Sequence, residues 1–425
     1  MRRPSTPPLL RHNRSFRDFW TGQTISLFGD EITLLALPLL AILELDAGPA
    51  QVGLLSAAAL APNLLFSIHL GAWADRRDRR RSLMVAADLG RAALLLTIPV
   101  AALLGVLTFA QLYVVAFAAG SLSVLFAVAY NVVFVSLVER DEYVAASSLL
   151  NGSRAVAITS GASIGGLLVQ VLTAPIALLA DAGSYLASAL FVRRAEAEEA
   201  PPDQEREHGG LAAGARYIAR TPLIRASLLA AATFNLFNLA FYGIFVLYVT
   251  QELDVSPGAL GLVMAIGGVG SLVGILITGR LSRRIGLGRA LLAGFVLTPA
   301  PLLLVPAAAG APGLVLPLLA VAEFFNGVGL MVLDVGLGAL YAAAVPDPLR
   351  ARVSGAFLLV NYGVRPIGAL GGGLLAAAIG LQTTMWVTAI GALLGVLWLL
   401  PSPMPQLRDL PEGALDGHSV GTGPG

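Results

Sequence analysis

Residues 71–81 read Gly71-Ala-Trp-Ala-Asp75-Arg76-Arg-Asp-Arg-Arg-Arg81, and this stretch decides the fold. It lies between two long apolar segments and places five arginines and two aspartates within eleven residues. A weaker copy, Gly279-Arg-Leu-Ser-Arg-Arg284-Ile-Gly-Leu-Gly-Arg289, follows half a chain length later, again between two apolar segments. A basic hairpin repeated between apolar segments indicates an internally duplicated membrane protein, an architecture typical of transporters.

The composition is that of a membrane protein along the whole chain. The 425 residues are 56% hydrophobic and 12% charged, whereas a soluble domain carries about 25% charged residues. The mean hydropathy is +0.80, and apolar runs long enough to cross a hydrocarbon core recur throughout. The predicted spans lie near residues 19–43, 52–70, 83–104, 111–137, 145–171, 174–192, 223–250, 257–279, 290–309, 313–345, 353–379 and 382–400. We therefore predict an all-α polytopic membrane protein with twelve transmembrane helices.

The arginines predict how the chain is oriented. All 27 basic residues are arginine, and all except Arg91, Arg154 and Arg365 fall in the tails or in alternate loops. The loops of the other parity hold no arginine, and two of them are acidic, at residues 44–46 and 252–254. By the positive-inside rule, both termini are expected in the cytoplasm, with the chain as a multi-pass protein of the cell membrane.

The repeat extends beyond the basic hairpin and predicts two six-helix halves. Val138–Ser147 aligns with Val345–Ser354, and the glycines of 161–166 align with those of 368–373. The expected organisation is a cytoplasmic N-terminal tail (1–18), a first half (19–192), a cytoplasmic linker (193–222), a second half (223–400) and a cytoplasmic C-terminal tail (401–425). We expect a short helix at 211–219 along the membrane surface, and disorder in the C-terminal tail.

These motifs together resemble the major facilitator superfamily over residues 14–400. The resemblance is greatest to the branch that contains macrolide-efflux proteins and the enterobactin exporter, which are of the drug:proton antiporter type. The residues that carry it are Phe16 to Trp20, Gly22, Gln23, Gly29, Asp30, Ala36 to Leu39, Gly71 to Arg80, Gly161 to Gly166, and Leu349 to Gly355. The chain departs from the pattern at Arg283, where the second hairpin lacks its aspartate, and at Ala162, where antiporters tend to have proline.

Four carboxylates within the predicted spans are candidates for proton coupling. Asp30 and Glu31 lie near the centre of the first span, and Glu323 and Asp334 share one face of the tenth. An ionisable group at this depth costs several kcal/mol unless it faces a cavity or a partner. The alternatives are a structural pairing with an arginine for the first two, and a solvated position near the cytoplasmic end for Asp334.

A second set of polar residues is expected to line the substrate cavity. The resemblance implies that spans 1, 4, 7 and 10 surround this cavity. The candidates are Gln23, Asn235, Asn238, Tyr242, Asn326, Asn361 and Arg365. Arg365 lies in the middle of the eleventh span, so we expect Glu323 or Asp334 as its partner. A local salt bridge is expected between Asp88 and Arg91, and the alternative for Arg365 is likewise a structural ion pair.

The hairpin and its surroundings are expected to form a conformational switch. In the arrangement that the resemblance implies, Asp75 lies beside the start of the eleventh span, and Arg76 and Arg79 pair with acids of the next cytoplasmic loop. The residues expected in this switch are Gly71, Asp75, Arg76, Arg79, Glu139 and Asp141. Gly161, Gly165 and Gly166 are expected to allow close helix packing.

The sequence therefore predicts a secondary active transporter, an exporter of small amphipathic molecules driven by proton influx. The alternatives are an exporter of a siderophore or other secondary metabolite, an importer, and a non-transporting membrane sensor. Enzymatic activity, a cofactor, a metal site and nucleic-acid binding are not expected, because no nucleotide-binding motif, ligand spacing or nucleophile–base arrangement occurs. The expected partners are the substrate, protons and the lipid bilayer, with the chain acting as a monomer. The residues do not identify the substrate.

Overall fold

The structure, a computed structural model, describes residues 8–75, 79–196 and 211–408. Within these residues the regular structure is helical, and twelve segments are long and apolar enough to cross a membrane. The prediction of an all-helical protein with twelve spans is therefore confirmed. The first six spans are α2 (Arg14–Leu45), α3 (Pro49–Asp75), α4 (Arg80–Leu103), α5 (Phe109–Leu137), α6 (Tyr143–Val171) and α7 (Ala174–Arg194).

The last six spans are built in the same way, with one interruption. They contain α9 (Pro222–Gln251), α10 (Pro257–Ile285), α11 (Leu287–Leu297), α13 (Val315–Ala344), α14 (Asp347–Ile379) and α15 (Leu381–Leu394). The ninth span changes after α11 into a 3-10 turn and the short helix α12 (Leu304–Ala307). Pro299, Pro301 and Pro306 lie in this stretch, and each removes a backbone donor from the helix. Two further short helices, α1 (Pro8–His12) and α8 (Leu211–Arg220), precede the two sets of spans.

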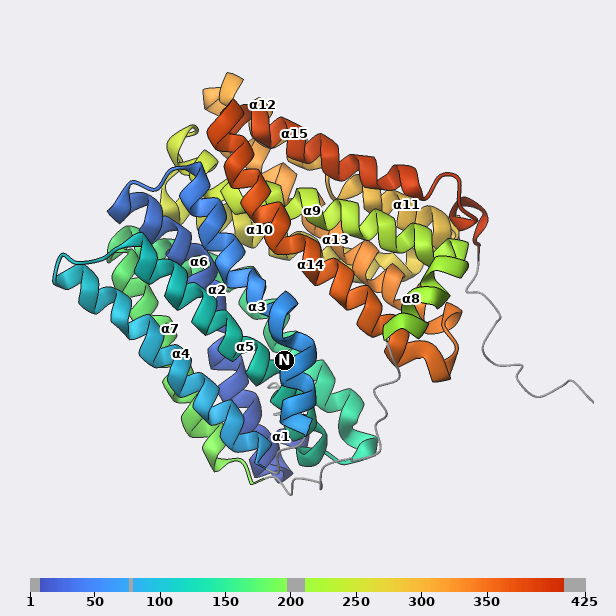
Figure 1. Cartoon of the computed structure of the whole chain (residues 1–425), viewed down its shortest axis with the longest axis horizontal. Coiled ribbons are helices and arrows are strands. Elements are labelled where there is room, and N and C mark those ends of the chain that lie inside the picture. The colour runs from blue at the N-terminus through green and yellow to red at the C-terminus, as the bar shows by residue number, and fades with distance from the viewer. Residues whose placement is uncertain (1–7, 76–78, 197–210, 409–425) are drawn as a thin grey trace, which may run out of the picture.

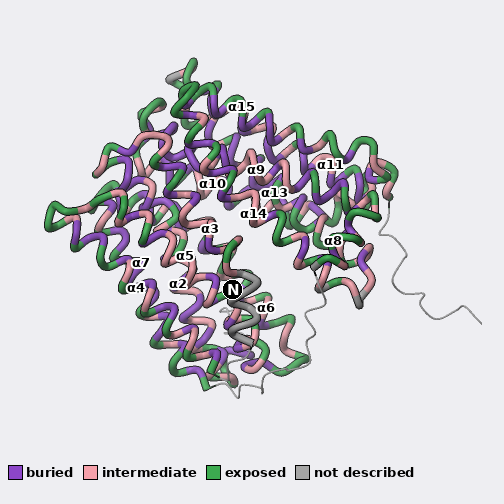
Figure 2. The backbone as a smooth tube through the Cα atoms, viewed as in Figure 1, coloured by how far each residue is buried: buried purple, intermediate pink, exposed green. Residues whose placement is uncertain are grey.

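The helices form two bundles that meet along two helix pairs. The first bundle contains α2 to α7, and the second contains α9 to α15 (Figure 1). Between the bundles, α3 packs against α14 and α6 packs against α10. Large apolar side chains such as Val114, Leu276 and Ile367 are more than half exposed within their spans, while the buried residues line the helix contacts (Figure 2). This distribution suits a protein whose outer surface contacts lipid.

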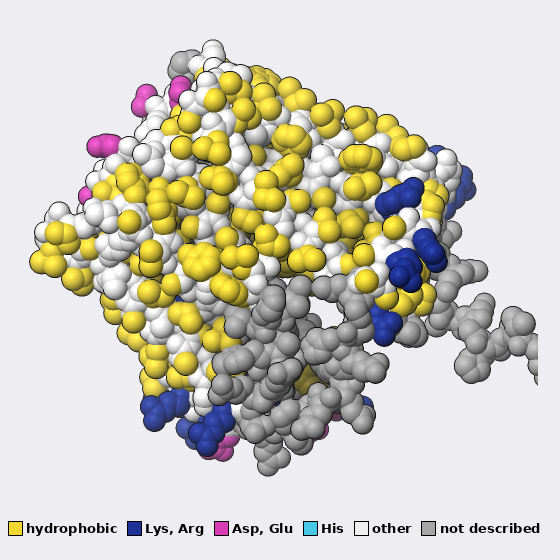
Figure 3. All heavy atoms as spheres, viewed as in Figure 1, with side chains coloured by type: hydrophobic (Ala, Val, Ile, Leu, Met, Phe, Trp, Pro, Cys, Tyr) yellow, Lys and Arg dark blue, Asp and Glu magenta, His cyan; other side chains and the backbone are white. Residues whose placement is uncertain are grey.

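Charged side chains distinguish the two ends of the molecule. One end carries the arginines of 79–81, 193–194, 280–289 and 350–352, and we call it the arginine-rich end. The opposite end, the arginine-free end, carries Glu44, Asp46, Glu252 and Asp254. In Figure 3 the basic side chains gather at the lower and right-hand edge, with a few acidic ones among them at the lower edge, whereas acidic side chains alone lie at the upper left. A hydrophobic surface separates the two ends. The separation agrees with the alternation of loop charge in the sequence.

The bundles touch most closely towards the arginine-free end. Gly53 of α3 lies so near Gly373 of α14 that a Cβ on Gly373 would be 2.7 Å from the Gly53 Cα. In the α6–α10 pair, the Ser163 hydroxyl donates to the Gly261 carbonyl at 3.2 Å. Gly166 faces the Gly261 Cα, which would be 3.1 Å from an added Cβ. Apart from the Ser163 hydroxyl, these contacts are between backbones, so the arginine-free end is closed.

Some boundaries differ from the sequence-based prediction. Helix α2 begins at Arg14, inside the predicted tail, because Asn13 caps it by accepting from the Phe16 amide at 2.8 Å. The predicted disorder of the C-terminal tail is wrong as far as residue 408. There the Leu407 and Arg408 carbonyls accept from the amides of residues 288 and 287, at 2.9 and 3.0 Å. Residues beyond 408 lie outside the described part of the chain.

Helix α8, in the predicted linker, packs on the second bundle. Its Ile218 is buried, and the Tyr217 hydroxyl donates to the Ala344 carbonyl at 2.8 Å. Gly214 lets α8 approach the Arg352 backbone at the start of α14. The helix predicted at 211–219 is therefore present, and it contacts α14 and α9 at the arginine-rich end.

Candidate functional site

Asp30 lies in the middle of α2 and connects three helices. Its Oδ1 accepts a hydrogen bond of 2.5 Å from the Tyr185 hydroxyl of α7. The Tyr185 ring in turn lies under the Arg91 guanidinium of α4, with 4.1 Å between Cζ and the ring centroid. Tyr185 and Arg91 are buried, whereas Asp30 is exposed. One side of the Asp30 carboxylate is thus held by the bundle, and the rest of the side chain is accessible.

Arg91 is also the partner of Asp88, one turn away on α4. The guanidinium donates to the Asp88 carboxylate, and both side chains are almost completely buried. The predicted salt bridge is therefore confirmed. Arg91 also contacts residues of other helices. The Arg91 guanidinium lies over the Phe126 ring at 4.7 Å and within electrostatic reach of Asp30. The pair thus forms the inner part of a polar network that leads to Asp30.

Asp181 of α7 is a third carboxylate in this network, and it is fully buried. It accepts hydrogen bonds from the Thr33 hydroxyl of α2 and from the Ser184 hydroxyl, the latter at 2.9 Å. Gly29 makes this approach possible, because a Cβ there would overlap the Asp181 carboxylate and Ser184. Asp181 thus packs against the neighbouring helix α2, and its carboxylate lies within electrostatic reach of Asp30.

Glu31 of α2 faces α6, the helix that carries Arg154. Glu31 packs against Gly161 of α6, where an added Cβ would lie 2.6 Å from the Glu31 Cβ. Gly165 lies against the next residue of α2, Ile32. Arg154 is exposed and within electrostatic reach of both Asp30 and Glu31. Gln23, two turns before Asp30, is buried, and its amide nitrogen has no hydrogen-bond partner among the described residues.

In the second bundle, Glu323 is enclosed by its neighbours. It is 5% exposed, and its carboxylate accepts from the Tyr242 hydroxyl of α9 at 3.0 and 3.1 Å. Asn326 lies within 3.1 Å of the same hydroxyl and donates to the Thr298 carbonyl at 2.9 Å. Asp334, by contrast, is exposed. Although the two residues share one face of α13, they do not lie on one open path in this conformation, because α9 and α10 cover that face at Glu323 and leave it open at Asp334.

Asn235, Asn361 and Arg365 form a separate group between α9 and α14. The Asn235 amide donates to the Asn361 side-chain oxygen at 2.9 Å, and the Arg365 Nε donates to the Asn235 Oδ1 at 3.3 Å. The Arg365 guanidinium lies 4.8 Å from the Tyr362 ring centroid. The prediction that Glu323 or Asp334 pairs with Arg365 is therefore wrong. Glu323 accepts from Tyr242 instead, and neither carboxylate forms an ion pair with Arg365 among the described residues. Asn238, on the same helix, has a buried side-chain oxygen without a hydrogen-bond partner.

A cavity of about 440 Å³ lies between the bundles on the arginine-rich side of the Gly53–Gly373 contact. It is formed by α3, α5 and α14, and none of the seven residues expected to line the substrate cavity is among its lining residues. Its wall is mainly apolar with a few polar groups, and the lining residues are Asn63, Leu64, Val124, Ala127, Val128, Asn131, Gly355, Leu358, Leu359 and Tyr362. Size and lining match a site for a drug-sized amphipathic molecule.

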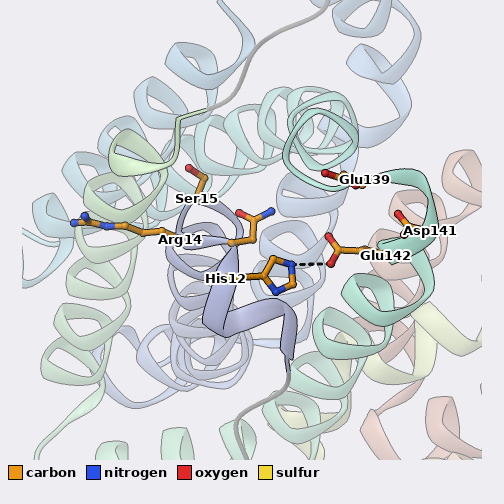
Figure 4. Close-up of a pocket in the computed structure, with 7 residues that line it drawn as sticks. His12, Arg14, Ser15, Glu139, Asp141 and Glu142 are labelled. Atoms are coloured by element: carbon orange, nitrogen blue, oxygen red, sulfur yellow. Dashed lines mark hydrogen bonds and ion pairs between the residues drawn. The ribbon is translucent and has the colours of Figure 1, made fainter.

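The acids expected in the conformational switch line a second cavity, at the arginine-rich end. Glu139 and Asp141 lie beside Glu142, which accepts from the His12 ring at 2.8 Å (Figure 4). Arg79 is exposed, and no ion pair joins it to Glu139 or Asp141 within the described residues. The burial of Gly71, the side chain of Asp75 and the whole of Arg76 lie outside the described residues.

Sequence reasoning missed several members of this site. Tyr185, which joins Asp30 to Arg91, and Tyr362, which joins Arg365 to the cavity, were not selected. Neither residue is unusual in a span, so composition alone gives no signal. Asp181 and Arg91 do give one, because ionisable residues inside spans are costly. No group of three or more potential metal ligands occurs in the residues that the structure describes.

Two bundles of six spans that close at one end around an interbundle cavity define a transporter with the major facilitator fold. A family model described as "Transmembrane secretion effector" matches residues 5–416, and the chain belongs to this family. The resemblance that the sequence motifs indicate is thereby confirmed. The chain is a multi-pass membrane transporter of a drug-efflux-like branch.

Relatives are similar along nearly their whole length. An uncharacterised transporter of the superfamily, YfiS of Bacillus subtilis, is 28% identical over 418 residues, covering 94% of this chain and 96% of the relative. The multidrug efflux pump Tap of Mycolicibacterium fortuitum is 27% identical over 405 residues, covering 90% and 93%. Each of these two proteins is therefore similar to this chain over more than nine-tenths of its own length.

Solved structures share the fold at low sequence identity. The nucleoside transporter NupG matches with a TM-score of 0.73 at 13% identity, covering 91% of this chain and 98% of that one. A bacterial homologue of the human lysosomal transporter Spinster, in an inward-facing and unoccupied conformation, matches with a TM-score of 0.71 at 14% identity, covering 95% and 98%. At such identities the likeness shows the fold alone.

Proposed function

We propose that the chain exports small amphipathic molecules across the cell membrane in exchange for protons, by alternating access. The distribution of arginine supports a cytoplasmic position for both termini, the linker 193–222 and the arginine-rich end. The halves 19–192 and 223–400 are the two moving units, and a single copy of the chain suffices. The closed arginine-free end then faces outward, and the cavity between the bundles belongs to an inward-facing state.

The observation that carries proton coupling is the position of Asp30. The residue is exposed within a membrane span while one carboxylate oxygen is held by Tyr185. An exposed carboxylate at this depth faces water inside the protein rather than lipid, because exposure to lipid costs several kcal/mol. Arg154 of α6, which lies within electrostatic reach, indicates the same interior side. Asp30 can therefore exchange protons with the water between the bundles.

The surroundings of Asp30 make its charge important for the first bundle. The groups that face it are Tyr185 and Asp181 from α7, Arg91 and Asp88 from α4, Arg154 from α6, and its neighbour Glu31. Arg91 is the buried cation of this group, and its partner Asp88 already neutralises it. A proton on Asp30 removes one uncompensated charge from this network. Binding of a proton therefore has a different free energy in two arrangements of the bundle, which is the requirement for coupling.

The interbundle cavity and one relative support the substrate class and direction. A mainly apolar cavity of about 440 Å³ lies in the range of small-molecule sites. The similar protein Tap is named a multidrug efflux pump. We infer that this chain likewise binds amphipathic molecules from the arginine-rich side and releases them at the arginine-free side.

Dissipation of a proton gradient across everted membrane vesicles tests this function. A preformed gradient, acidic inside, is challenged with macrolides, cationic dyes and catecholate siderophores, and dissipation of the gradient is followed by a pH-sensitive dye. We expect at least one compound to dissipate the gradient with the unchanged protein, and Asp30→Asn to reduce the initial rate by about 100-fold or more, as for loss of a coupling residue worth about 2.7 kcal/mol.

The matched control is Asp46→Asn, the same chemical change at the end of the same helix. Asp46 is exposed and has φ of 51°, a conformation that asparagine also adopts. We expect this variant to transport at the wild-type rate. If no compound in the panel dissipates the gradient with wild-type protein, proton-driven multidrug export is excluded for this panel. If Asp30→Asn and Asp46→Asn behave alike, Asp30 is not the coupling residue.

A further inference from the structure

Arg365 is an intramembrane cation without a carboxylate partner. It lies at the middle of the span Arg352–Ile379, where a charged side chain is costly unless it has a partner or faces water. It faces the protein, since its Nε donates to Asn235 of α9. The ion pairs in the described part of the chain are Arg91–Asp88 and His12–Glu142, so Arg365 belongs to none.

The two terminal nitrogens of Arg365 are available for a ligand. Among the described residues, only its Nε has a hydrogen-bond partner. Neither terminal nitrogen is among the buried polar atoms that lack a partner, and the side chain is only half-buried. Both nitrogens are therefore accessible, and they are the part of a guanidinium that binds an oxyanion in a fork.

Tyr362 connects this guanidinium, which is not itself part of the cavity wall, to the interbundle cavity. It lines the cavity, and its ring centroid is 4.8 Å from the Arg365 Cζ. The rest of the wall is mainly apolar, from Leu64 and Val128 of the first bundle to Leu358 of the second. A ligand can therefore bury an apolar body in the cavity while an anionic end reaches Arg365.

Other charges do not fill this position. Glu323, one of the two carboxylates expected to pair with Arg365, accepts from Tyr242, and Asp334 forms no ion pair with Arg365 among the described residues. Asn235 contributes a neutral oxygen to Arg365 and is itself bound to Asn361. A neutral hydrogen bond orients the guanidinium but leaves its charge uncompensated, so the group gains most from a ligand of opposite charge.

We propose that Arg365 and Tyr362 form an anion-binding subsite of the interbundle cavity, so that the chain binds amphipathic molecules that carry a carboxylate or similar oxyanion. The inference rests on the proposed function in one respect, because it takes the cavity as the substrate site. It adds the chemical class of the substrate: an apolar body of drug size with one anionic end. Asn235 and Asn361 are positioning residues that hold the guanidinium in place against α9.

Binding of a matched pair of probes tests the subsite. The full chain is reconstituted in nanodiscs of phosphatidylcholine, and 11-(dansylamino)undecanoic acid is compared with its uncharged primary amide by dansyl fluorescence. Empty nanodiscs measure partition of each probe into lipid. We expect the acid to bind at least about tenfold more tightly than the amide, a difference of about 1.4 kcal/mol.

Two substitutions assign the preference to Arg365. Arg365→Gln is expected to abolish the tenfold preference while leaving binding of the amide within about twofold, and Arg365→Lys to retain part of it because the charge remains. The control is Arg284→Gln, the same change at an exposed position of α10. It is expected to keep the full preference for the acid.

The outcomes separate this inference from the proposed function. Equal binding of acid and amide by the wild type, or a preference that survives Arg365→Gln, overturns the subsite. If Arg365→Gln does not fold, the acid–amide comparison on the wild type and Arg365→Lys still decides. Dissipation of a proton gradient by uncharged or cationic compounds with no acid preference rejects the subsite and leaves proton-driven export intact. Preferential binding of the acid, without dissipation of a proton gradient by any compound, supports the subsite and rejects proton-driven export.

Discussion

Substitution of Gly373 by alanine should open the arginine-free end. A Cβ at this position would lie 2.6 Å from the Pro49 carbonyl oxygen and 2.7 Å from the Gly53 Cα. Both atoms belong to the backbone of α3, so neither can rotate away as a side chain could. The bundles must separate there to accept the methyl group, and the closed state is destabilised relative to a state in which α3 and α14 are apart.

The size of the effect follows from the kind of contact. Overpacking of a close contact costs about 1–3 kcal/mol. The higher helix propensity of alanine, about 1 kcal/mol, applies in both states and cancels from their difference. The equilibrium between closed and open forms should therefore shift by a factor of about 5–150. Gly371→Ala is the matched control, because it makes the same change on α14 where no atom lies within 4 Å.

The chain contains no cysteine, so one introduced thiol reports on the opening without background. Ser163→Cys replaces a hydroxyl that donates to the Gly261 carbonyl across the α6–α10 contact. Reaction with a membrane-impermeant maleimide should accelerate with Gly373→Ala by about the same 5–150-fold factor if the open form is the minor one. It should remain unchanged with Gly371→Ala. An unaltered rate with Gly373→Ala refutes the reasoning, because the glycine contact would then not control access.

Two further predictions concern the polar networks within the bundles. Gly29→Ala should lower the thermal stability of the purified protein, because the new Cβ would overlap the Asp181 carboxylate; Gly183→Ala, with no atom within 4 Å, should not. The loss should be about 1–3 kcal/mol, and equal melting temperatures for the two variants would contradict it. Tyr242→Phe should cost about 1–3 kcal/mol because Glu323 loses its donor. A melting curve identical to that of the wild type would show that water replaces the hydroxyl.

Depth in the membrane was predictable from the sequence, whereas the direction in which a side chain points was not. Hydropathy located all twelve spans, because it measures the cost of each segment in lipid. The same reasoning placed Asp30 and Arg365 at mid-span. It failed for the partner of Arg365, because the neighbour of a helix face depends on how helices cross. Glu323 and Asp334 show this most clearly, since one face of α13 is covered at the first and open at the second.

The proposed site was predictable only in part for the same reason. Asp30 could be selected because a carboxylate inside a span is rare. Tyr185 could not, because a tyrosine in a span has no special cost and its importance comes from lying between Asp30 and Arg91. Such a link joins residues far apart in sequence, and no periodicity within one helix encodes it.

The glycine contact between α3 and α14 has a consequence for how such a protein diversifies. The contact and the cavity occupy different turns of the same two helices. Gly53 and Gly373 form the contact, whereas Leu64 and Leu358 line the cavity. Because the contact is between backbones, it depends little on the size of the side chains in the cavity wall. Mutations in the cavity wall can therefore alter which molecules bind, while the equilibrium between the closed and open forms stays the same. Recognition and gating can then evolve as separate traits within one pair of helices.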